Sequence, residues 1–395
     1  MEYVTVGGTG VRVSPLCFGT MSFGSEADEA ASGEMFARCR DAGINFFDTA
    51  NVYGGGASET ILGKLIAGSR DDLVITSKVF FPTGSDVNAG GLSRRHITRA
   101  VEDSLTRLGT DRLDFYFVHN FDERTPIEET VRTLDDLQAQ GKILYPAVSN
   151  WAAWQIATAL GVAAREHLAR FELIQPMYNL VRRQAEVEIL PLARAANLGV
   201  ISYSPLGGGL LTGKYGTGKR PEAGRLVESQ LYIDRYAFDS DYATAEAFTA
   251  FAAKAGIRPA TLAVAWAMSK PAVTAPIIGA RNLSQLADSL AALDVAMTAG
   301  LRAEISALSV TPAPATDRTE TLKDLQKLKL RGPAELYTPT GYPSVIVGQP
   351  RRYPPRSTHD HTEPSIPGAV SYLNGGNVRR ALAPGWHLTA FDPRC

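Results

Sequence analysis

Cysteine is scarce in this sequence, and neither sign of charge predominates. Only three of its 395 residues are cysteines, and they are widely spaced. This excludes a disulfide framework and a cysteine-rich zinc site, and it favours a reduced, cytoplasmic location. The 40 Lys and Arg residues are balanced by 41 Asp and Glu residues. The chain therefore has no general attraction for nucleic acid or for an anionic membrane surface, and neither is expected as a partner.

Long hydrophobic runs are absent as well. No stretch approaches the roughly 18 to 20 apolar residues that cross a bilayer, and the apolar run 260–268 ends at Ser269 and Lys270. The first ten residues have neither the basic start nor the apolar segment of a secretory signal. Apolar residues make up 45% of the chain and charged residues 21%, which is typical of a folded globular protein.

The sequence does contain a regular alternation of short apolar runs with helix-like segments. The apolar runs are typical of parallel strands buried on both faces, and they lie at 17–20, 44–48, 73–78, 113–119, 143–150, 172–176, 199–205 and 272–279. Helical periodicity appears between them, at 28–42, 93–108, 127–140, 151–164 and 184–196. Glycines stand where helix C-caps are expected, at 109, 141, 161 and 199.

This alternation predicts an α/β fold, specifically a (β/α)8 TIM barrel rather than an open doubly wound sheet. A dinucleotide-binding Rossmann fold would carry G-x-G-x-x-G after its first strand, but the segment 19–24 reads GTMSFG. The N-terminal residues predict two short strands joined by the glycine-rich segment 7–10. We expect this β-hairpin to close the bottom of the barrel.

The composition changes near residue 310. Ten of the 23 prolines fall within residues 331–395. We therefore expect a barrel domain over 1–315 and a Pro-rich C-terminal extension over 316–395 that is poorly ordered on its own. The extension is either a partner-binding segment or a read-through or frame-altered end. Its His359 and His361 lack the further ligands of a metal site, so no metal is expected.

Four polar residues follow consecutive predicted strands. Asp48, Lys78 and His119 each close a strand, and Tyr53 follows Asp48 by five residues. In a TIM barrel these strand ends face the active site. Taken singly, each has a structural explanation, as a surface tyrosine, a solvated lysine, a helix N-cap or a core histidine. Together they favour catalysis.

The four side chains suit one reaction, the protonation of a carbonyl oxygen while a hydride reaches its carbon. The Lys78 ammonium is expected to lower the pKa of Tyr53 from its ordinary value of about 10. Asp48 would keep Lys78 protonated and in place. His119, as a neutral or charged donor, would orient and polarise the carbonyl group.

The later strand ends suit a nicotinamide cofactor. Ser149, Asn150 and Gln175 can hydrogen-bond a carboxamide, although each could instead cap its strand. Tyr203 offers a flat face for stacking, although buried tyrosines are common.

The phosphates of such a cofactor have candidate partners further along the chain. The glycine-rich loop 204–214 ends in Lys214 and would let backbone N–H groups approach phosphate oxygens, unless it is merely a flexible connection. Arg281, beside a predicted helix N-terminus, suits the 2′-phosphate of NADPH.

The order of these motifs resembles the aldo-keto reductase family over residues 1 to about 310. The shared segments are GTMSFG at 19, DTANVYG at 48, TSK at 76, VHNFD at 118, AVSNW at 147, QPMYN at 175, SYSPLGGGLLTGKY at 202 and PIIGARN at 276. The resemblance implies a TIM barrel that reduces aldehydes and ketones with NADPH. It also implies that Tyr53 is the general acid and that Lys78, Asp48 and His119 are its catalytic partners.

The resemblance extends to the residues that bind NADP(H). In related reductases an Arg at position 281 and a Gln at 285 bind the adenosine end, and an Asn follows the next acidic residue; here that pair is Asp288-Ser289, which leaves the adenine contact open. The expected cofactor-binding residues are Gly19, Thr20, Met21, Asp48, Ser149, Asn150, Gln175, Tyr203, Ser204, Pro205, Leu206, Gly207, Gly209, Leu211, Lys214, Ile278, Gly279, Arg281 and Gln285.

The substrate side carries weaker signals. The polar segment 217–239 is expected to form a loop near the site. Any of the aromatic or polar residues just past the strand ends could pack loops together instead. The residues expected at the mouth are Phe23, Tyr53, Phe80, His119, Asn120 and Trp151, with Phe81 and Tyr232 as further candidates.

The sequence therefore predicts an NADPH-dependent oxidoreductase that reduces an aldehyde or ketone, such as a sugar or another metabolite carbonyl. One alternative is a regulatory or partner-binding module that senses NADPH. Another is a lyase or isomerase that uses Lys78 as a Schiff base. The substrate, the physiological direction and the oligomeric state stay open.

Overall fold

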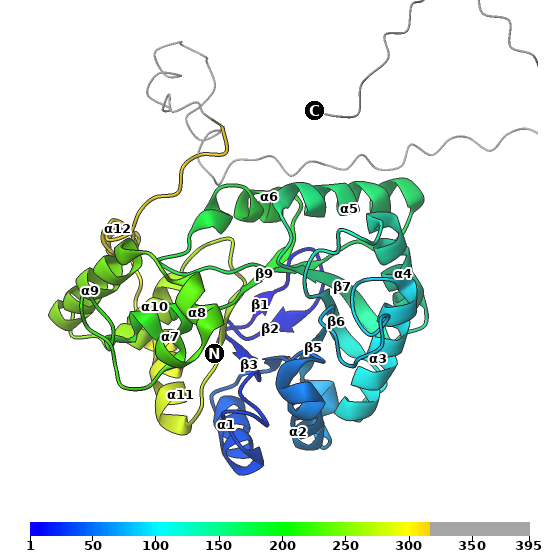
Figure 1. The fold of residues 1–395 in the computed structure, drawn as a ribbon, viewed down its shortest axis with the longest axis horizontal. Helices are drawn as coiled ribbons and strands as arrows, with labels where there is room; N and C mark the ends of the chain where they lie inside the picture. The colour runs from blue at the N-terminus through cyan, green and yellow to red at the C-terminus, as the bar shows by residue number, and fades with distance from the viewer. Residues whose placement is uncertain (317–395) are drawn as a thin grey trace, which may run out of the picture. The chain divides into compact units, whose positions relative to one another are not determined.

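Eight parallel strands close into a barrel in the computed structural model, which describes residues 1–316. Around the barrel the strands follow the order β10-β3-β4-β5-β6-β7-β8-β9 (Figure 1). They are β3 Cys17–Gly19, β4 Phe46–Asp48, β5 Val74–Val79, β6 Leu113–Val118, β7 Ile143–Ser149, β8 Leu173–Gln175, β9 Gly199–Ser202 and β10 Ala275–Ile278. The predicted (β/α)8 barrel is confirmed.

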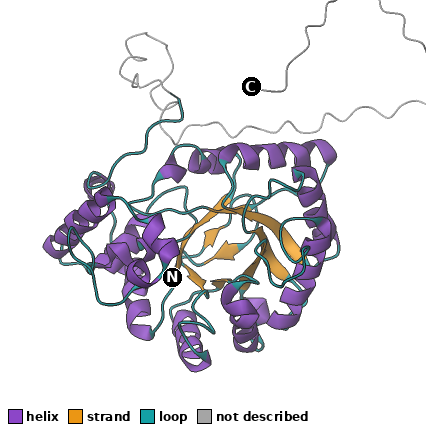
Figure 2. Ribbon diagram, viewed as in Figure 1, coloured by secondary structure: helices purple, strands orange, loops and turns teal. Residues whose placement is uncertain are grey.

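Helices surround the barrel, as Figure 2 shows. Those in the connections up to β9 are α1 Glu29–Asp41, α2 Ala57–Ile66, α3 Arg94–Leu108, α4 Ile127–Ala139, α5 Ala153–Glu166 and α6 Ile189–Ala195. After β9 come α7 Arg225–Glu228, α8 Gln230–Arg235, α9 Asp239–Lys254, α10 Pro259–Met268, α11 Leu283–Leu290 and α12 Ala299–Ser306. Short 3-10 helices are η1 Tyr53–Gly56, η2 Arg70–Asp72, η3 Gln184–Glu186, η4 Gly207–Thr212 and η5 Ala291–Asp294.

The strands are apolar because both of their faces are covered. All six residues of β5 and all six of β6 are buried. Successive side chains of a strand point to opposite faces. In β5, Thr76 therefore reaches Asp48 of the neighbouring strand, whereas the next residue, Ser77, donates a hydrogen bond to the buried Glu59 of α2.

The predicted hairpin is present and closes the barrel from below. Strands β1 Val4–Thr5 and β2 Arg12–Val13 pair antiparallel. Val6 and Val13 are fully buried and join an apolar cluster whose other buried members come from the barrel strands. Gly7 has φ +49°, and a Cβ there would lie 2.4 Å from the backbone nitrogen of Gly199. Glycine is therefore required where the hairpin meets β9.

Strand register brings the polar strand ends to one rim. Asp48 pairs with Thr76 across β4 and β5, and Lys78 pairs with Phe117 across β5 and β6. Since all eight strands are parallel, their carboxyl ends meet at the same end of the barrel. The hairpin occupies the opposite end.

Several local expectations need correction. The helix expected over 184–196 is split into η3 and α6, because Pro191 has no N–H and fits only the first turn of a helix. Gly161 lies inside α5, which continues to Glu166, and Gly199 begins β9; neither is a C-cap. Gly109 does cap α3, with φ +61°.

The segment 217–239 is not simply a loop. It contains the two short helices α7 and α8, between the glycine-rich η4 and α9. It does lie near the strand ends, because Arg225, Tyr232 and Arg235 line the cavity described below. The expectations for the C-terminal extension fall outside the described residues, apart from residue 316 itself.

Candidate active site

A buried lysine lies at the centre of the strand-end rim. The Lys78 ammonium donates hydrogen bonds to Asp48 Oδ2 at 2.6 Å, to the Thr49 carbonyl at 2.7 Å and to the Tyr53 hydroxyl oxygen at 3.3 Å. An ammonium has three N–H donors, so all of them are engaged. Because Tyr53 accepts a bond from Lys78, its own O–H group is left to point elsewhere.

Asp48 acts as a fixed anchor for this lysine. Its Oδ2 accepts from Lys78, and its Oδ1 accepts from Thr76 at 2.7 Å and from Gln175 at 2.9 Å. The Asp48 side chain is only 3% exposed. Because donors from the protein occupy both of its oxygens, Asp48 fixes the position of Lys78.

Electrostatics keep Tyr53 protonated. Burial raises its pKa, and this effect outweighs the opposing charge and hydrogen bond of Lys78. Lys78 does lower the pKa of Tyr53, as expected, but the sequence could not show how deeply the phenol is buried, and burial leaves the pKa above its ordinary value. Burial alone would lower the pKa of Lys78, but the charge of Asp48 and the other contacts raise it. The pair is a neutral phenol beside a permanent ammonium.

His119 follows β6 and lies beside the phenol. Its ring is 5.9 Å from that of Tyr53 and 5.0 Å from that of Phe81, both edge-on. Burial, and then the charge of Lys78, set the pKa of His119 well below its ordinary value of 6.5. The imidazole is therefore neutral, which decides between the two forms that the sequence left open. A neutral ring can still donate one hydrogen bond to a carbonyl oxygen.

Three amide and hydroxyl groups meet beside this cluster. Ser149 Oγ donates to the Gln175 carbonyl at 3.0 Å, and Asn150 donates to the His119 carbonyl at 3.0 Å. The Tyr203 hydroxyl donates to Asn150 Oδ1 at 2.8 Å. These hydrogen bonds join residues at the ends of β7, β8 and β9 into one network at the rim of the barrel.

The loop after β9 carries three consecutive glycines in the left-handed region. Gly207, Gly208 and Gly209 have φ values of 59°, 67° and 103°. A Cβ on Gly208 would lie 2.7 Å from the ring of Tyr232, so that position accepts only glycine. The resulting turn, η4, exposes backbone to the cavity, and Lys214 follows it.

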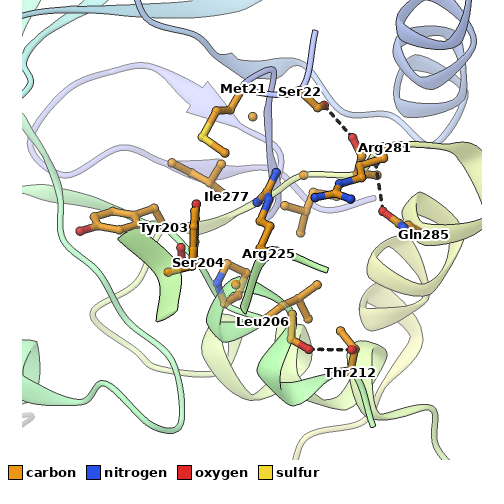
Figure 3. A pocket seen from close by; sticks show the side chains of 18 of the residues that line it. Met21, Ser22, Tyr203, Ser204, Leu206, Thr212, Arg225, Ile277, Arg281 and Gln285 are labelled. Carbon is orange, nitrogen blue, oxygen red and sulfur yellow. Dashed lines mark hydrogen bonds between the residues drawn. The ribbon is translucent and has the colours of Figure 1, made fainter. Parts of the chain in front are cut away.

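Two arginines on the far side of the cavity share one carboxylate. A guanidinium nitrogen of Arg281, just after β10, lies 2.5 Å from Glu26 Oε1, and one of Arg225, in α7, lies 2.6 Å from Glu26 Oε2. The backbone N–H of Arg281 donates to Gln285 Oε1 at 3.1 Å. Figure 3 shows Arg281 and Gln285 on the side of the pocket opposite Tyr203.

One cavity of about 570 Å³ connects these groups, from Tyr53 and His119 at one end to Arg281 and Gln285 at the other. A dinucleotide cofactor is long, planar at both ends and anionic in the middle and at a 2′-phosphate. The cavity offers Tyr203 for a ring, a glycine turn with Lys214 for phosphates and two arginines for a further phosphate. The residues present therefore fit such a cofactor.

Comparison with known proteins agrees with this geometry. The family model described as "Aldo/keto reductase family" matches residues 15–309. The chain belongs to the aldo/keto reductase family. It is 37% identical over 314 residues to an uncharacterised oxidoreductase, YrpG, of Bacillus subtilis, with 75% of this chain and 92% of that protein covered.

Two plant relatives of similar likeness carry a different name. Proteins named probable voltage-gated potassium channel subunit beta, from Oryza sativa subsp. japonica and Arabidopsis thaliana, are each 38% identical over 302 residues. Both alignments cover 75% of this chain and 92% of the relative. The family and the Bacillus relative support an oxidoreductase. Among the helices of residues 1–316, none is long and apolar enough to cross a membrane.

Many residues that the aldo/keto reductase resemblance implied lie on the wall of this cavity. From that set the wall contains Gly19, Met21, Asp48, Tyr53, His119, Ser149, Asn150, Gln175, Tyr203, Ser204, Pro205, Leu206, Gly209, Lys214, Ile278, Gly279, Arg281 and Gln285, and also Phe81 and Tyr232. Lys78 lies behind the wall, fully buried against Asp48 and Tyr53. Residues 1–316 bring no three His, Cys, Asp or Glu together as metal ligands, and His359 and His361 lie outside the described residues.

Other expected residues support the wall from behind. Thr20 is buried and bonded to Ser58, and Leu211 belongs to the apolar core; Gly207 turns the chain without lining the cavity. Phe23 packs fully buried with its ring 5.8 Å from that of Phe18, so it does not reach the mouth.

Three further residues expected at the substrate mouth lie outside this wall, although each is close in sequence to a residue that lines it. Phe80 packs against the apolar core, and Asn120 is absent from the wall. Trp151 lines a second cavity of about 330 Å³. Ser289 is buried and does not line the main cavity, whereas its neighbour Asp288 does.

Sequence reasoning missed several residues of the site. Glu26, which pairs with two arginines of the wall, follows the GTMSFG segment without any distinctive spacing. Arg225, Leu231 and Arg235 come from the segment 217–239, whose polarity indicated only proximity to the site. Their roles depend on how α7 and α8 pack beside the cavity, and no local sequence pattern predicts that packing.

Proposed function

We propose that this protein is an NADP(H)-dependent carbonyl reductase, with Tyr53 as the proton donor. One observation carries the proposal: the Tyr53 hydroxyl lies 3.3 Å from a fully buried ammonium, on the wall of the same cavity as Tyr203 and Arg281. A pure binding module would have no use for a phenol beside such a charge. When bound, the reduced dinucleotide supplies the hydride.

The chain's own residues would hold the nicotinamide ring and the carbonyl group in place and would supply the proton. Tyr203 would stack on the nicotinamide ring, and Ser149, Asn150 and Gln175 would hold its carboxamide. The Tyr53 O–H, which is not used by Lys78, would donate its proton to the carbonyl oxygen. The Lys78 ammonium would stabilise the phenolate that remains, and Asp48 would hold Lys78 in place. Neutral His119 would donate a hydrogen bond that orients the carbonyl.

The remaining cofactor residues would bind the other half of the dinucleotide. The glycine turn of η4, together with Lys214, would approach the pyrophosphate. Arg281 and Arg225 would share the 2′-phosphate, which supports NADP(H) over NAD(H). A cytoplasmic location, where thiols stay reduced, suits the buried unpaired Cys17 and Cys39.

Schiff-base chemistry on Lys78 has little support. A lysine must be neutral to attack a carbonyl, but the pKa of Lys78 is raised, and its three donors are engaged by Asp48, Thr49 and Tyr53. Among the described residues, nothing favours the sensor alternative over the reductase. The potassium channel names belong to the plant relatives and give no specific partner for this chain.

The proposal is tested with the full chain and the variant Tyr53→Phe. We expect wild type to oxidise NADPH when given members of a panel of aldehydes, ketones and sugars, and NADH is tested in parallel. Tyr53→Phe should lower kcat by at least about a hundredfold, which is within the range of general-acid contributions. Its affinity for NADPH, measured by quenching of protein fluorescence, should change less than about threefold.

A second tyrosine controls for the loss of a hydroxyl. Tyr145 lies in β7 and stacks on Phe115 in the cluster at the hairpin end of the barrel. Tyr145→Phe should keep wild-type turnover. If Tyr53→Phe also keeps it, Tyr53 is not the acid. If wild type binds NADPH tightly but reduces no carbonyl of the panel, the sensor alternative replaces the reductase.

A further inference from the structure

One arginine of the cavity wall has no carboxylate partner in residues 1–316. Arg225 and Arg281 both pair with Glu26, and Arg258 pairs with Asp288 at 3.0 Å. Arg235, the last residue of α8, lines the same cavity and makes no ion pair within the described part of the chain. A guanidinium cannot lose its charge, so Arg235 presents a permanent and uncompensated cation to the cavity.

Arg235 lies at the substrate end rather than at the adenosine end. The Tyr232 ring contacts both Arg225, at 5.5 Å, and Arg235, at 5.1 Å. Arg225 is tied to Glu26 and hence to Arg281. On the other side, the hydroxyl of Tyr236, the residue after Arg235, lies 3.2 Å from Asn179 Nδ2, and the same nitrogen donates to the Ser204 carbonyl at 2.9 Å. Because Ser204 follows Tyr203, these bonds bring the end of α8 to the proposed nicotinamide platform. The charge of Arg235 also opposes the burial that raises the pKa of Tyr203 to about 12.

The second cation without an ion pair on this wall, Lys214, is placed differently. It follows the glycine turn η4, and its Nζ would lie 3.4 Å from a Cβ on Gly224, the residue before Arg225, so it belongs to the phosphate end. The two unpaired cations of the described wall thus lie in different parts of the cavity. Lys214 is accounted for by the cofactor phosphates, but Arg235 has no assigned ligand.

The backbone that carries Arg235 is held firmly. Its carbonyl oxygen accepts a hydrogen bond from Arg182, which also pairs with Asp241 at 2.7 Å. The next residue, Tyr236, is fully buried and its hydroxyl is bonded to Asn179 at 3.2 Å. Because the end of α8 is anchored in this way, the guanidinium is presented to the cavity from a fixed point.

The cavity also has apolar side chains and, among the described residues of its wall, no free negative charge. Val52 precedes Tyr53, the Phe81 ring lies 5.0 Å from that of His119, and Leu231 belongs to α8, as Arg235 does. The two aspartates of the described wall are already paired, Asp48 with Lys78 and Asp288 with Arg258. A lone guanidinium beside apolar side chains favours a planar anion that can form two parallel hydrogen bonds.

We propose that Arg235 binds a carboxylate of the substrate, so that the preferred substrates are aldehydes or ketones that carry a carboxylate across an apolar spacer. This inference rests on the proposed reductase function and names its substrate class. The carbonyl oxygen is directed to Tyr53 and His119, the spacer lies against the apolar wall, and the carboxylate reaches Arg235.

The test compares two aldehydes that differ only in charge, 4-carboxybenzaldehyde and its methyl ester, with NADPH saturating. We expect wild type to prefer the carboxylate in kcat/KM by about tenfold or more. Arg235→Gln should abolish that preference and leave kcat/KM for the ester within about threefold of wild type. Arg235→Lys, which keeps the charge but not the planar fork, should retain part of the preference.

A matched control comes from the same segment. Arg220 also packs over a tyrosine, with its guanidinium 3.5 Å from the Tyr242 ring centre, but it does not line the cavity. Arg220→Gln should keep the wild-type preference. Equal losses for both aldehydes in Arg235→Gln, or an unchanged preference, would show that Arg235 does not bind the carboxylate.

Equilibrium binding separates this inference from the reductase proposal. Calorimetry on NADP⁺-loaded protein compares 4-(hydroxymethyl)benzoate with its methyl ester. Tighter binding of the carboxylate, lost in Arg235→Gln, supports the inference even if neither aldehyde is reduced and the reductase proposal fails. No preference in wild type overturns it. An Arg235→Gln variant whose NADPH affinity falls as much as its carboxylate affinity also overturns it, because Arg235 then belongs to the cofactor site.

Discussion

Replacing Lys78 by methionine tests the electrostatic core of the proposed mechanism. The substitution keeps an apolar chain of similar length in a fully buried position but removes the ammonium. Two consequences follow from the structure. Asp48, 3% exposed at its side chain, loses its ion pair with Lys78, and Tyr53 loses the charge that would stabilise its phenolate.

The kinetic magnitude follows from the 3.3 Å distance between Lys78 Nζ and the Tyr53 oxygen. At an effective dielectric constant of about 20, a full negative charge on Tyr53 would gain about 5 kcal/mol from the ammonium. If about half of that charge has developed in the transition state, the loss is about 2.5 kcal/mol, or nearly a hundredfold in rate. Separately, an orphaned buried carboxylate destabilises the fold by about 3–5 kcal/mol.

A double variant separates the two effects. Asp48→Asn combined with Lys78→Met leaves no unpaired buried charge, so it should recover most of the free energy of unfolding that Lys78→Met loses. It should not recover the rate. We would measure urea unfolding, NADPH affinity by fluorescence and the single-turnover rate of NADPH oxidation with the best aldehyde, so that product release does not hide the chemical step.

The reasoning fails if the double variant is folded, binds NADPH within about threefold of wild type and still reduces aldehyde within about threefold of the wild-type rate. In that case the ammonium would contribute only to stability, and proton donation would depend on another group. A slow double variant that binds NADPH normally supports the assignment.

Two further predictions concern pH and cofactor choice. Because the pKa of Tyr53 is above 10.0 and that of His119 is well below 6.5, the single-turnover rate of reduction should be flat between those values and should fall only as pH rises through the Tyr53 pKa; a stopped-flow profile with a step inside that range would contradict these shifts. Glu26 must share Arg281 and Arg225 with a 2′-phosphate, so Glu26→Gln should tighten NADPH binding about three- to tenfold and change NADH binding less. Glu29→Gln, whose carboxylate pairs with Lys64 at 2.8 Å outside the cavity, is the matched control for that titration, and weaker NADPH binding in Glu26→Gln would mean that Glu26 instead helps to hold the cofactor in place.

Long-range architecture was predictable because it depends on repeated local patterns. Strands such as β5 and β6 are apolar along their whole length, and this pattern indicates burial on both faces. The ends of elements were less predictable. Gly161 looks like a helix end, but α5 continues past it to Glu166, where burial of Val162 and Ala163 offsets the cost of a glycine.

Several site residues were predictable for the same reason. Asp48, Lys78 and His119 stand at strand ends, and parallel strands in a barrel present those ends at one rim. Protonation states were not predictable, because they depend on depth. The sequence places a lysine near Tyr53, but only the packing shows that burial outweighs the lysine and keeps the phenol protonated.

The order of the apolar strands in the sequence by itself determined the barrel. It also determined which polar residues form the rim, because parallel strands place all their carboxyl ends at the same end of the barrel. Only the tertiary structure decided what covers the rim. Glu26, Arg225 and Arg235 come from connections without periodicity, and Glu26 pairs with Arg225 and with Arg281, which is 255 residues away along the chain. No local pattern encodes such a pairing, because it exists only once the barrel has closed.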